Sequence, residues 1–209
     1  MSHLLKPLLL AVSLVAASTA AQANLLVNGG FEDSTSPVAT PPGWFNIGHN
    51  DGVITYAAFN TPVYEGVNYY DLGGYGDANG PIGDGIAQSF ATTVGATYTV
   101  SFGLSGENSS GDETLTVAAG NVSLDYPLIP DGSGVFQRPF VTQTFNFVAT
   151  SALTTLSFVH TAGPGGNNDP LIDGVSVTLA SSVPEPETYA LLLAGLGVVG
   201  FSLARRRAA

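Results

Sequence analysis

The 209-residue chain contains no cysteine, so neither disulfides nor thiolate-bound zinc can contribute to its stability or chemistry. Basic residues are also scarce, with five Lys and Arg against 16 Asp and Glu. Arg138 is the single base between Asn24 and Ala180, a stretch that holds 14 of the acidic residues and has a formal charge near −13. Such a charge repels phosphate backbones, which argues against nucleic acid as a partner, and it favours hard cations such as Ca²⁺.

A sustained apolar period of 3.6 residues is missing from residues 24–180, which argues against a helical body. Short β-rich runs alternate there with clusters of Gly, Pro, Asn and Asp. The run at 97–104 places apolar residues on one face and Thr, Ser and Gly on the other, which is typical of a half-buried strand. The sequence predicts an all-β domain, a jelly-roll β-sandwich, with strands at residues 24–28, 52–59, 68–72, 85–91, 97–104, 114–118, 141–148, 154–160 and 171–179.

Motifs of known catalytic sites are also missing. The sequence has no Gly-x-Ser-x-Gly elbow and no His-Glu-x-x-His pattern to unite His49 with the distant His160. No feature singles out two carboxylates as an opposed glycosidase pair. The segment Gly106–Gly111 lacks the lysine of a phosphate-binding loop and is interpreted as a turn. We therefore expect a protein without enzymatic activity.

The N-terminal residues have the pattern of a secretion signal. Lys6 precedes an apolar run at residues 7–17, and Ala21-Gln22-Ala23 has the small-x-small pattern that signal peptidase accepts. We expect residues 1–23 to be a signal peptide and the chain to be exported. Residues 24–180 then have the size of one domain.

The C-terminal end has three parts in a fixed order. These are the motif Val183-Pro184-Glu185-Pro186, an uncharged stretch at 188–204, and the basic cluster Arg205-Arg206-Arg207. At about 1.5 Å per residue the stretch spans about 25 Å as a helix, near the lower limit for crossing a bilayer. The sequence predicts a Pro/Glu linker at 181–187, a transmembrane helix at 188–204 and a basic cytoplasmic tail at 205–209. An ordinary membrane anchor or a buried core helix is the alternative.

This order, from Val183 to Arg207, resembles the PEP-CTERM sorting signal of Gram-negative bacteria. The resemblance implies that exosortase, a membrane-embedded transpeptidase of organisms that make exopolysaccharide, recognises the tail. It also implies a membrane-anchored precursor that is delivered to the cell surface or extracellular matrix. Adhesion or association with exopolysaccharide in a biofilm is the function expected from this.

A second resemblance covers nearly the whole body. Its landmarks follow in chain order: residues 25–32 (LLVNGGFE), Gly43-Trp44, residues 71–74 (DLGG), 85–90 (GIAQSF), 95–102 (GATYTVSF), 155–158 (TLSF) and 171–177 (LIDGVSV). Together they resemble carbohydrate-binding-module-like jelly rolls and the "choice-of-anchor C" group of exported bacterial proteins. The resemblance implies a galactose-binding-like sandwich. Polysaccharide binding is the alternative function that it raises, and action on glycosides is a third.

Related sandwiches hold a structural Ca²⁺ where the first strand ends against the last one, and the matching positions are Gly30, Glu32 and Asp173. A carboxylate buried after Leu171 and Ile172 requires either a metal or a backbone partner. The alternative is an exposed loop at Glu32 and a simple turn at Asp173. Another acidic cluster, formed by Asp77, Asn79 and Asp84, lacks the spacing of an EF-hand, and turn chemistry explains it equally well.

Four aromatic residues are candidates for stacking on a sugar ring: Trp44, Tyr64, Tyr69 and Tyr75. Trp44 serves either this role or core packing. Tyr69 and the adjacent Tyr70 lie in a predicted strand, so their rings point to opposite faces and one of them is expected to be exposed. Tyrosine also fits a half-exposed sheet for structural reasons alone.

Overall fold

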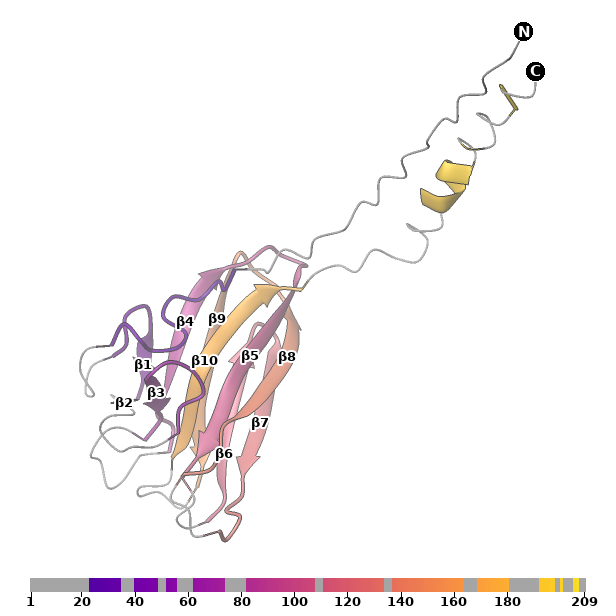
Figure 1. Cartoon of the computed structure of the whole chain (residues 1–209). Coiled ribbons are helices and arrows are strands. Elements are labelled where there is room, and N and C mark those ends of the chain that lie inside the picture. The colour runs from indigo at the N-terminus through magenta and orange to yellow at the C-terminus, as the bar shows by residue number, and fades with distance from the viewer. Residues whose placement is uncertain are drawn as a thin grey trace.

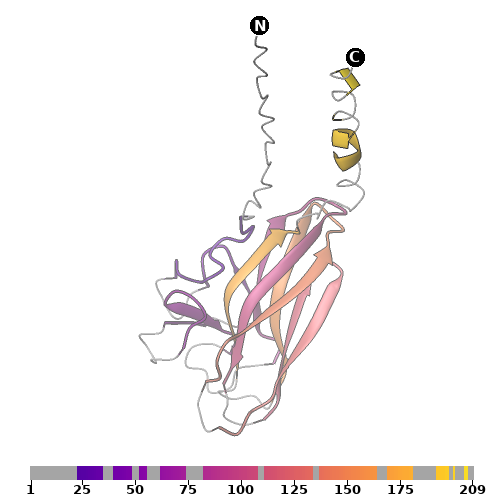
Figure 2. The same cartoon turned by 45° about the vertical axis from the view of Figure 1, so that its right-hand side comes forward.

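A computed structural model describes residues 23–34, 40–48, 52–55, 62–73, 82–107, 111–133, 137–163, 169–180, 192–197, 200 and 205–206. These residues form two antiparallel sheets that pack face to face (Figures 1 and 2). The prediction of an all-β jelly-roll sandwich is therefore confirmed. Residues 1–22, Val183 to Pro186 and Arg207 lie outside the described residues, so the signal peptide and the sorting motif are not described.

Each sheet has five strands. The first has the order β1-β4-β9-β6-β7, with bounds Phe45–Ile47, Gly85–Ala91, Leu153–Ala162, Glu113–Ala119 and Val122–Leu128. The second has the order β2-β3-β10-β5-β8, with bounds Val53–Thr55, Asn68–Asp71, Pro170–Leu179, Thr97–Gly106 and Val141–Val148. Strands that are distant in the sequence pair within both sheets, as in a jelly roll.

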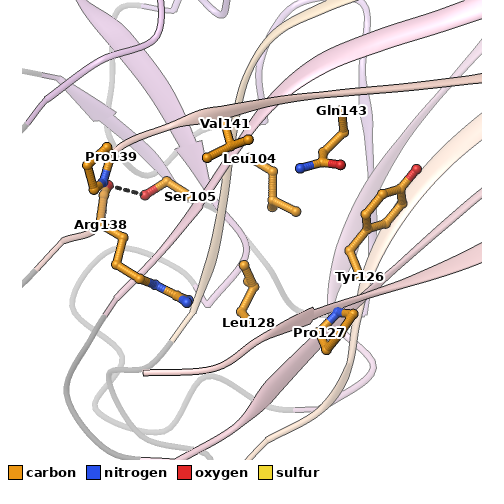
Figure 3. A pocket seen from close by; sticks show the side chains of 9 residues that line it. All are labelled: Leu104, Ser105, Tyr126, Pro127, Leu128, Arg138, Pro139, Val141 and Gln143. Atoms are coloured by element: carbon orange, nitrogen blue, oxygen red, sulfur yellow. Dashed lines mark hydrogen bonds between the residues drawn. The ribbon is translucent and has the colours of Figure 1, made fainter. Parts of the chain in front are cut away.

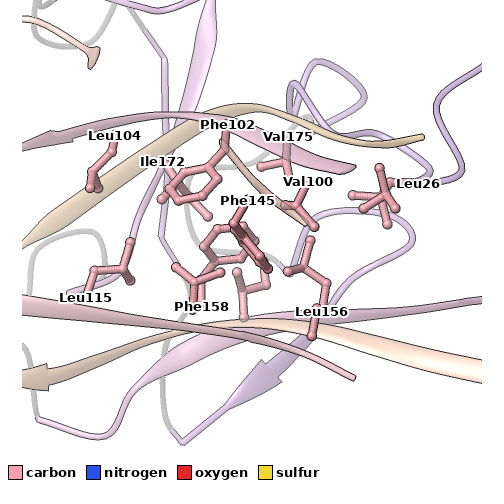
Figure 4. Packing of buried hydrophobic residues seen from close by; sticks show 14 of the residues in the cluster. Leu26, Val100, Phe102, Leu104, Leu115, Phe145, Leu156, Phe158, Ile172 and Val175 are labelled. Carbon is pink, nitrogen blue, oxygen red and sulfur yellow. The ribbon is translucent and has the colours of Figure 1, made fainter. Parts of the chain in front are cut away.

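The core lies between the sheets and follows from the alternation of side chains. In β6 every second residue is buried, from Glu113 to Ala119. Phe102 of β5 and Phe158 of β9 meet across the interface with their ring centroids 5.0 Å apart, and Figure 4 shows aliphatic residues around them. Each large apolar side chain that is fully buried contributes about 1.5–3 kcal/mol to folding, so this interface accounts for much of the stability.

A bulge in β10 changes which side chains face the core. Ile172 is buried in the core, and after the irregularity between Asp173 and Ser176 the core positions become Val175 and Val177. Gly174 within the bulge has φ +57°, a left-handed conformation that glycine adopts without strain. Asp173 lies before the bulge and directly after the core residue Ile172, so alternation places its carboxylate on the outer face of the second sheet.

The N-terminal segment at residues 24–29 lies beside β10. Leu25 N donates to Val177 O and Val175 N donates to Gly29 O, both at 2.9 Å. The body therefore begins and ends at the same end of the sandwich, the upper end in Figure 1. Many strands begin or end at the opposite end, where several connections meet.

Most predicted strands are observed with shifted bounds, and three differences stand out. The predicted strand at 24–28 is a bonded segment without regular strand structure. Only Val53–Thr55 of the predicted strand at 52–59 is described as a strand. Two strands were not predicted, namely β1 and β7. The strand β7 contains Pro127, which is tolerated there because β7 lies at the edge of its sheet.

Candidate functional site

The outer face of the second sheet carries short, uncharged polar side chains over three adjacent strands. One row across β10, β5 and β8 consists of Ser176, Ser101 and Thr144, and the next consists of Thr178, Thr99 and Asn146. Successive rows on one face of a sheet are about 7 Å apart. In the second row, Thr99 Oγ1 donates to Asn146 Oδ1 at 2.9 Å. These rows offer hydroxyl and amide groups without a formal charge.

Tyr64 covers the neighbouring row of this face. In that row Asp173, Gly103 and Thr142 lie side by side. A Cβ built on Gly103 would lie 2.5 Å from the Cγ of the Tyr64 ring, and one built on Gly174 would lie 2.6 Å from its Cδ1. The ring therefore rests on the backbone of two strands, and only glycine leaves room for it there.

The Tyr64 ring is held in place but remains accessible. Its hydroxyl is 2.8 Å from Thr142 Oγ1, and its ring centroid is 6.3 Å from that of Phe140. The residue is 38% exposed, so the ring keeps a surface open to solvent beside the polar rows. An aromatic ring next to uncharged hydroxyl groups is suited to a sugar, which has an apolar ring face and a polar edge.

Asp173 anchors the segment that carries Tyr64. Tyr64 N and Glu65 N donate to Asp173 Oδ2 at 2.9 and 3.0 Å, and Gly174 N donates to Oδ1 at 2.6 Å. The residue is fully buried, and burial raises the pKa of its carboxyl to about 7, although the three backbone hydrogen bonds act in the opposite direction. Asp173 is therefore the predicted buried carboxylate, and it has backbone partners.

Glu32 anchors the same segment further along the chain, at Val67 and Asn68. Val67 N and Asn68 N both donate to Glu32 Oε1 at 2.9 Å. Asn68 Nδ2 donates to Phe31 O at 3.0 Å, which ties this segment to the N-terminal one. Two carboxylates thus hold the main chain of residues 64–68 through its N–H groups. The backbone of Tyr64 is therefore held by bonds other than those of its own ring.

Two of the predicted calcium ligands, Glu32 and Asp173, accept hydrogen bonds from the main chain of the same segment, residues 64–68. Three of the roughly four acceptor positions of the Asp173 carboxylate are occupied by N–H groups, and one remains. The carboxylate of Glu65 lies beside Gly30, where a built Cβ would be 2.7 Å from Glu65 Oε1. Within the described ranges no group of three or more His, Asp or Glu side chains is arranged to hold a metal ion. Calcium at Gly30, Glu32 and Asp173 stays a prediction.

Two of the predicted ligand-binding rings belong to packed clusters instead. Trp44 is 7% exposed, its Nε1 donates to Asn28 O at 3.0 Å, and its ring lies 5.5 Å from that of Phe31. Tyr69 does point to the outer face while Tyr70 points into the core, but Tyr69 is only 4% exposed. Neither ring offers a face to a ligand, because apolar neighbours cover both. Tyr75 lies outside the described residues.

Five buried carboxylates gather at the end of the sandwich opposite the N-terminal segment, and the sequence analysis assigned no role to four of them. Their exposed fractions are 1–7%, and they are Asp71, Asp84, Glu107, Glu113 and Asp169. Each lies at or next to a strand end, where acidic residues are ordinary turn formers, so composition gave no signal of burial.

Burial dominates the chemistry of this acidic end. It raises the pKa of Glu113 to about 8, and it also raises the pKa of Asp169. Repulsion by Asp71 raises both pKa values further. Burial lowers the pKa of His160, whose Nε2 lies 3.1 Å from Ala162 O and whose Nδ1 lies 3.7 Å from Asp169 Oδ1. These groups are therefore mostly uncharged at neutral pH, and the contact between His160 and Asp169 is not an ion pair.

Only part of the predicted C-terminal anchor is described. Residues 192–197 are helical and lie within the predicted span 188–204, and Arg205 and Arg206 are helical and exposed. Of the helical residues that are described, none form a helix long and apolar enough to cross a membrane. The extent of the anchor stays a prediction.

Comparison with known proteins gives matches to both parts of the chain. Residues 182–207 match the family model of the PEP-CTERM protein-sorting motif. Comparison with curated proteins gives no match. The PEP-CTERM motif at residues 182–207 indicates an exported precursor that is anchored in the membrane and sorted to the surface.

Several solved structures similar to the body come from proteins that bind or act on carbohydrates. A xylan-binding domain of carbohydrate-binding module family 22 has 14% identity and a TM-score of 0.50, with 77% of this chain and 98% of that chain covered. The arabinose-bound α-L-arabinofuranosidase MgGH51 has 16% identity and a TM-score of 0.53, with 77% and 27% covered. The module TmCBM61 with β-1,4-galactotriose has 16% identity and a TM-score of 0.48, with 75% and 99% covered. At these identities the likeness concerns the fold alone. The chain thus carries a PEP-CTERM sorting motif, and its body has the fold of carbohydrate-binding-module jelly rolls.

Proposed function

We propose that this protein is a non-catalytic, exported glycan-binding protein that exosortase processes at the cell surface of a Gram-negative bacterium. Binding to exopolysaccharide would give it a role in adhesion or in the biofilm matrix. The observation that carries the proposal is the exposed ring of Tyr64, held over Gly103 and Gly174 beside rows of uncharged polar side chains. The fold and the sorting motif support it.

The chemistry of the face favours a neutral polysaccharide. The rows beside Tyr64 offer Ser, Thr and Asn groups, and the body as a whole has a formal charge near −13. Long-range repulsion disfavours a polyanion, whereas a neutral chain avoids that penalty. Binding at such a face requires no reaction, and the carboxylate of Asp173, in the row under Tyr64, is buried and accepts three backbone hydrogen bonds.

The proposal is tested by affinity electrophoresis of the exported protein in gels that contain xylan, a β-glucan or a galactan. We expect retardation by at least one of these neutral polymers. Tyr64→Ala should weaken the binding by about tenfold or more, because a central aromatic contact is lost. Tyr64→Phe should retain most of the binding.

The matched control is Leu153→Ala on β9 of the other sheet, a side chain that is 62% exposed and distant from this face. It should leave the retardation unchanged. Equal migration of the wild type and Tyr64→Ala in every polymer, with both proteins folded, would exclude the outer face as the binding surface.

A further inference from the structure

Three short connections close the end of the sandwich where the body begins and ends, the upper end in Figure 1. They are residues 92–96 between β4 and β5, 120–121 between β6 and β7, and 149–152 between β8 and β9. Gly95 N donates to Ala149 O at 2.8 Å, which joins the first connection to the third. A Cβ built on Gly120 would lie 3.4 Å from Val148 O, so the second connection lies beside them. The three connections therefore form one continuous surface.

Large apolar side chains are exposed at this end. Val94, in the first connection, is 63% exposed, and Leu153, at the start of β9, is 62% exposed. Val148 and Leu179, at the ends of β8 and β10, are 45% and 40% exposed. Val148 and Leu179 pair with adjacent residues of β5, so these two strand ends lie close together. We call these four side chains the apolar tip.

The apolar tip is free of formal charge. The three connections contain no Asp, Glu, Lys or Arg, although the body as a whole has a formal charge near −13. On the described strands that lead to this end, the acidic residue nearest along the chain is Asp125, three residues after Val122 and about 10 Å from it at 3.3 Å per residue. This distance exceeds the Debye length of about 8 Å at physiological ionic strength. The tip can therefore approach an anionic surface that repels the rest of the body.

Other exposed apolar side chains of the body have charged neighbours. Leu124, Ile129 and Val67 are exposed, and each has an acidic residue one or two positions away in the chain. Single exposed apolar residues of that kind are ordinary in soluble proteins. A group of four without a neighbouring charge is instead typical of a surface that binds an apolar or interfacial partner.

The C-terminal chain leaves the body at the apolar tip. Ala180, the last described residue of the body, donates from N to Thr97 O at 2.9 Å. The sorting motif that follows indicates a membrane-anchored precursor. Residues 181–187 separate Ala180 from the predicted helix at 188–204, and seven residues reach at most about 25 Å when fully extended. The body is thus tethered to lipid by the end that carries the apolar side chains.

We propose that the apolar tip docks on the lipid surface of the bilayer that holds the precursor, with its four side chains inserted among the headgroups. Four side chains bury too little area for stable binding from solution, but the short tether keeps them at a high local concentration beside the lipid. Docking holds the linker with the Pro184-Glu185-Pro186 motif at the membrane surface. This inference rests on the membrane anchor and not on the proposed glycan binding, so either proposal can fail without the other.

The test uses the anchored precursor in vesicles of phosphatidylethanolamine and phosphatidylglycerol. Because the chain has no cysteine, Val94→Cys gives a single attachment point for a fluorophore. Val141→Cys is the matched control, since Val141 is 58% exposed, lies seven residues from Val148 along β8 and lines the cavity drawn in Figure 3. Lipids with a nitroxide at the headgroup should quench the label at position 94 by about twofold or more and leave the label at position 141 nearly unchanged.

A charge at the tip should prevent docking. In the Val94→Cys protein, Leu153→Glu should remove the quenching, because phosphatidylglycerol repels the carboxylate and insertion would desolvate it. Val141→Glu adds the same charge far from the tip and should leave the quenching intact. Thermal melts should show a similar Tm for both variants, because both side chains are exposed.

Three results would overturn the proposal: no quenching at position 94, equal quenching at positions 94 and 141, or quenching that survives Leu153→Glu. A fourth is a label at position 94 that is shielded from water without being quenched by lipid, with the shielding growing as the protein density in the vesicles rises. That result would show that a second copy of the chain, and not lipid, covers the apolar tip.

Discussion

The carboxyl of Glu113 makes the stability of this protein depend on pH in an unusual direction. Its folded-state pKa is raised from 4.5 to about 8, so between these values the folded state holds a proton that the unfolded state has lost. The stabilisation is complete below about pH 4.5 and is lost as the pH rises through 8. Asp169 acts in the same direction. Asp71 raises the pKa of both carboxyls by repulsion, Arg138 lowers that of Glu113, and His160 Nδ1 lies 3.7 Å from Asp169 Oδ1.

We therefore expect the free energy of unfolding to fall between pH 5 and pH 9, by up to about 1.4 kcal/mol per pH unit for each such group. Urea titrations at several pH values measure this. Glu113→Gln keeps the shape and removes the ionisation, so its profile should be flatter and its stability at pH 9 higher than that of the wild type. Identical profiles for the two proteins would contradict the assignment.

At the scale of single residues, the sequence identified which residue types could bind a ligand, but it did not predict which of them are exposed. Tyr64 was a candidate from the local density of tyrosines, but its platform depends on Gly103 and Gly174, which lie far away in the chain. Trp44 and Tyr69 share the composition signal of Tyr64 and are buried. Only tertiary packing separates an exposed ring from a covered one, so the sequence alone could not choose between them.

The segment at residues 64–68 is an element that two carboxylates hold on the sheet. Asp173→Asn replaces one acceptor by an amide that must face the N–H groups of Tyr64 and Glu65. We expect a loss of stability of about 1–3 kcal/mol and a weaker retardation in the polymer gels, because Tyr64 loses its fixed position. Leu179→Ala, on the same strand but outside the polar rows and without these bonds, is the control for general damage to β10. Full polymer binding by Asp173→Asn would contradict the anchoring role.

The same variant tests the calcium prediction for this segment. Thermal melts in calcium and in chelator should differ for the wild type and coincide for Asp173→Asn if an ion shares the remaining acceptor position with Glu32 and Gly30. A wild-type Tm that is equal in both conditions contradicts bound calcium and leaves the backbone bonds as the sole partners of Asp173.

Among the strands, alternation of apolar and polar residues located the long elements well. The strands β5, β8, β9 and β10 were foreseen because each buries one face over many residues. The short β1 and the proline-containing β7 were missed, since three residues show no period and proline lowers strand propensity away from sheet edges. The bulge in β10 had one local signal, the glycine after Asp173.

Across the chain as a whole, the geometry of the body fits a protein that is held by its C-terminal end. The N-terminal segment lies beside β10, so the two ends of the body share one end of the sandwich. The buried acidic cluster lies at the opposite end of the sandwich. An anchor at the C-terminus is therefore attached at the end of the body that lies farthest from this cluster.

The sorting motif at residues 182–207 predicts the fate of this anchor. In a host with exosortase, the intact mass of the exported protein should show loss of the tail after the Pro184-Glu185-Pro186 motif, and the protein should fractionate with the surface or the matrix. In the same host without exosortase, the tail and its apolar helix should remain and the protein should stay in the membrane fraction. Replacing the motif by Ala-Ala-Ala should reproduce the second result with the enzyme present, because recognition rather than hydrophobicity is lost. Retention of the helix in both hosts would mean that this end is a simple membrane anchor, and glycan binding would then occur on a protein that never leaves the membrane.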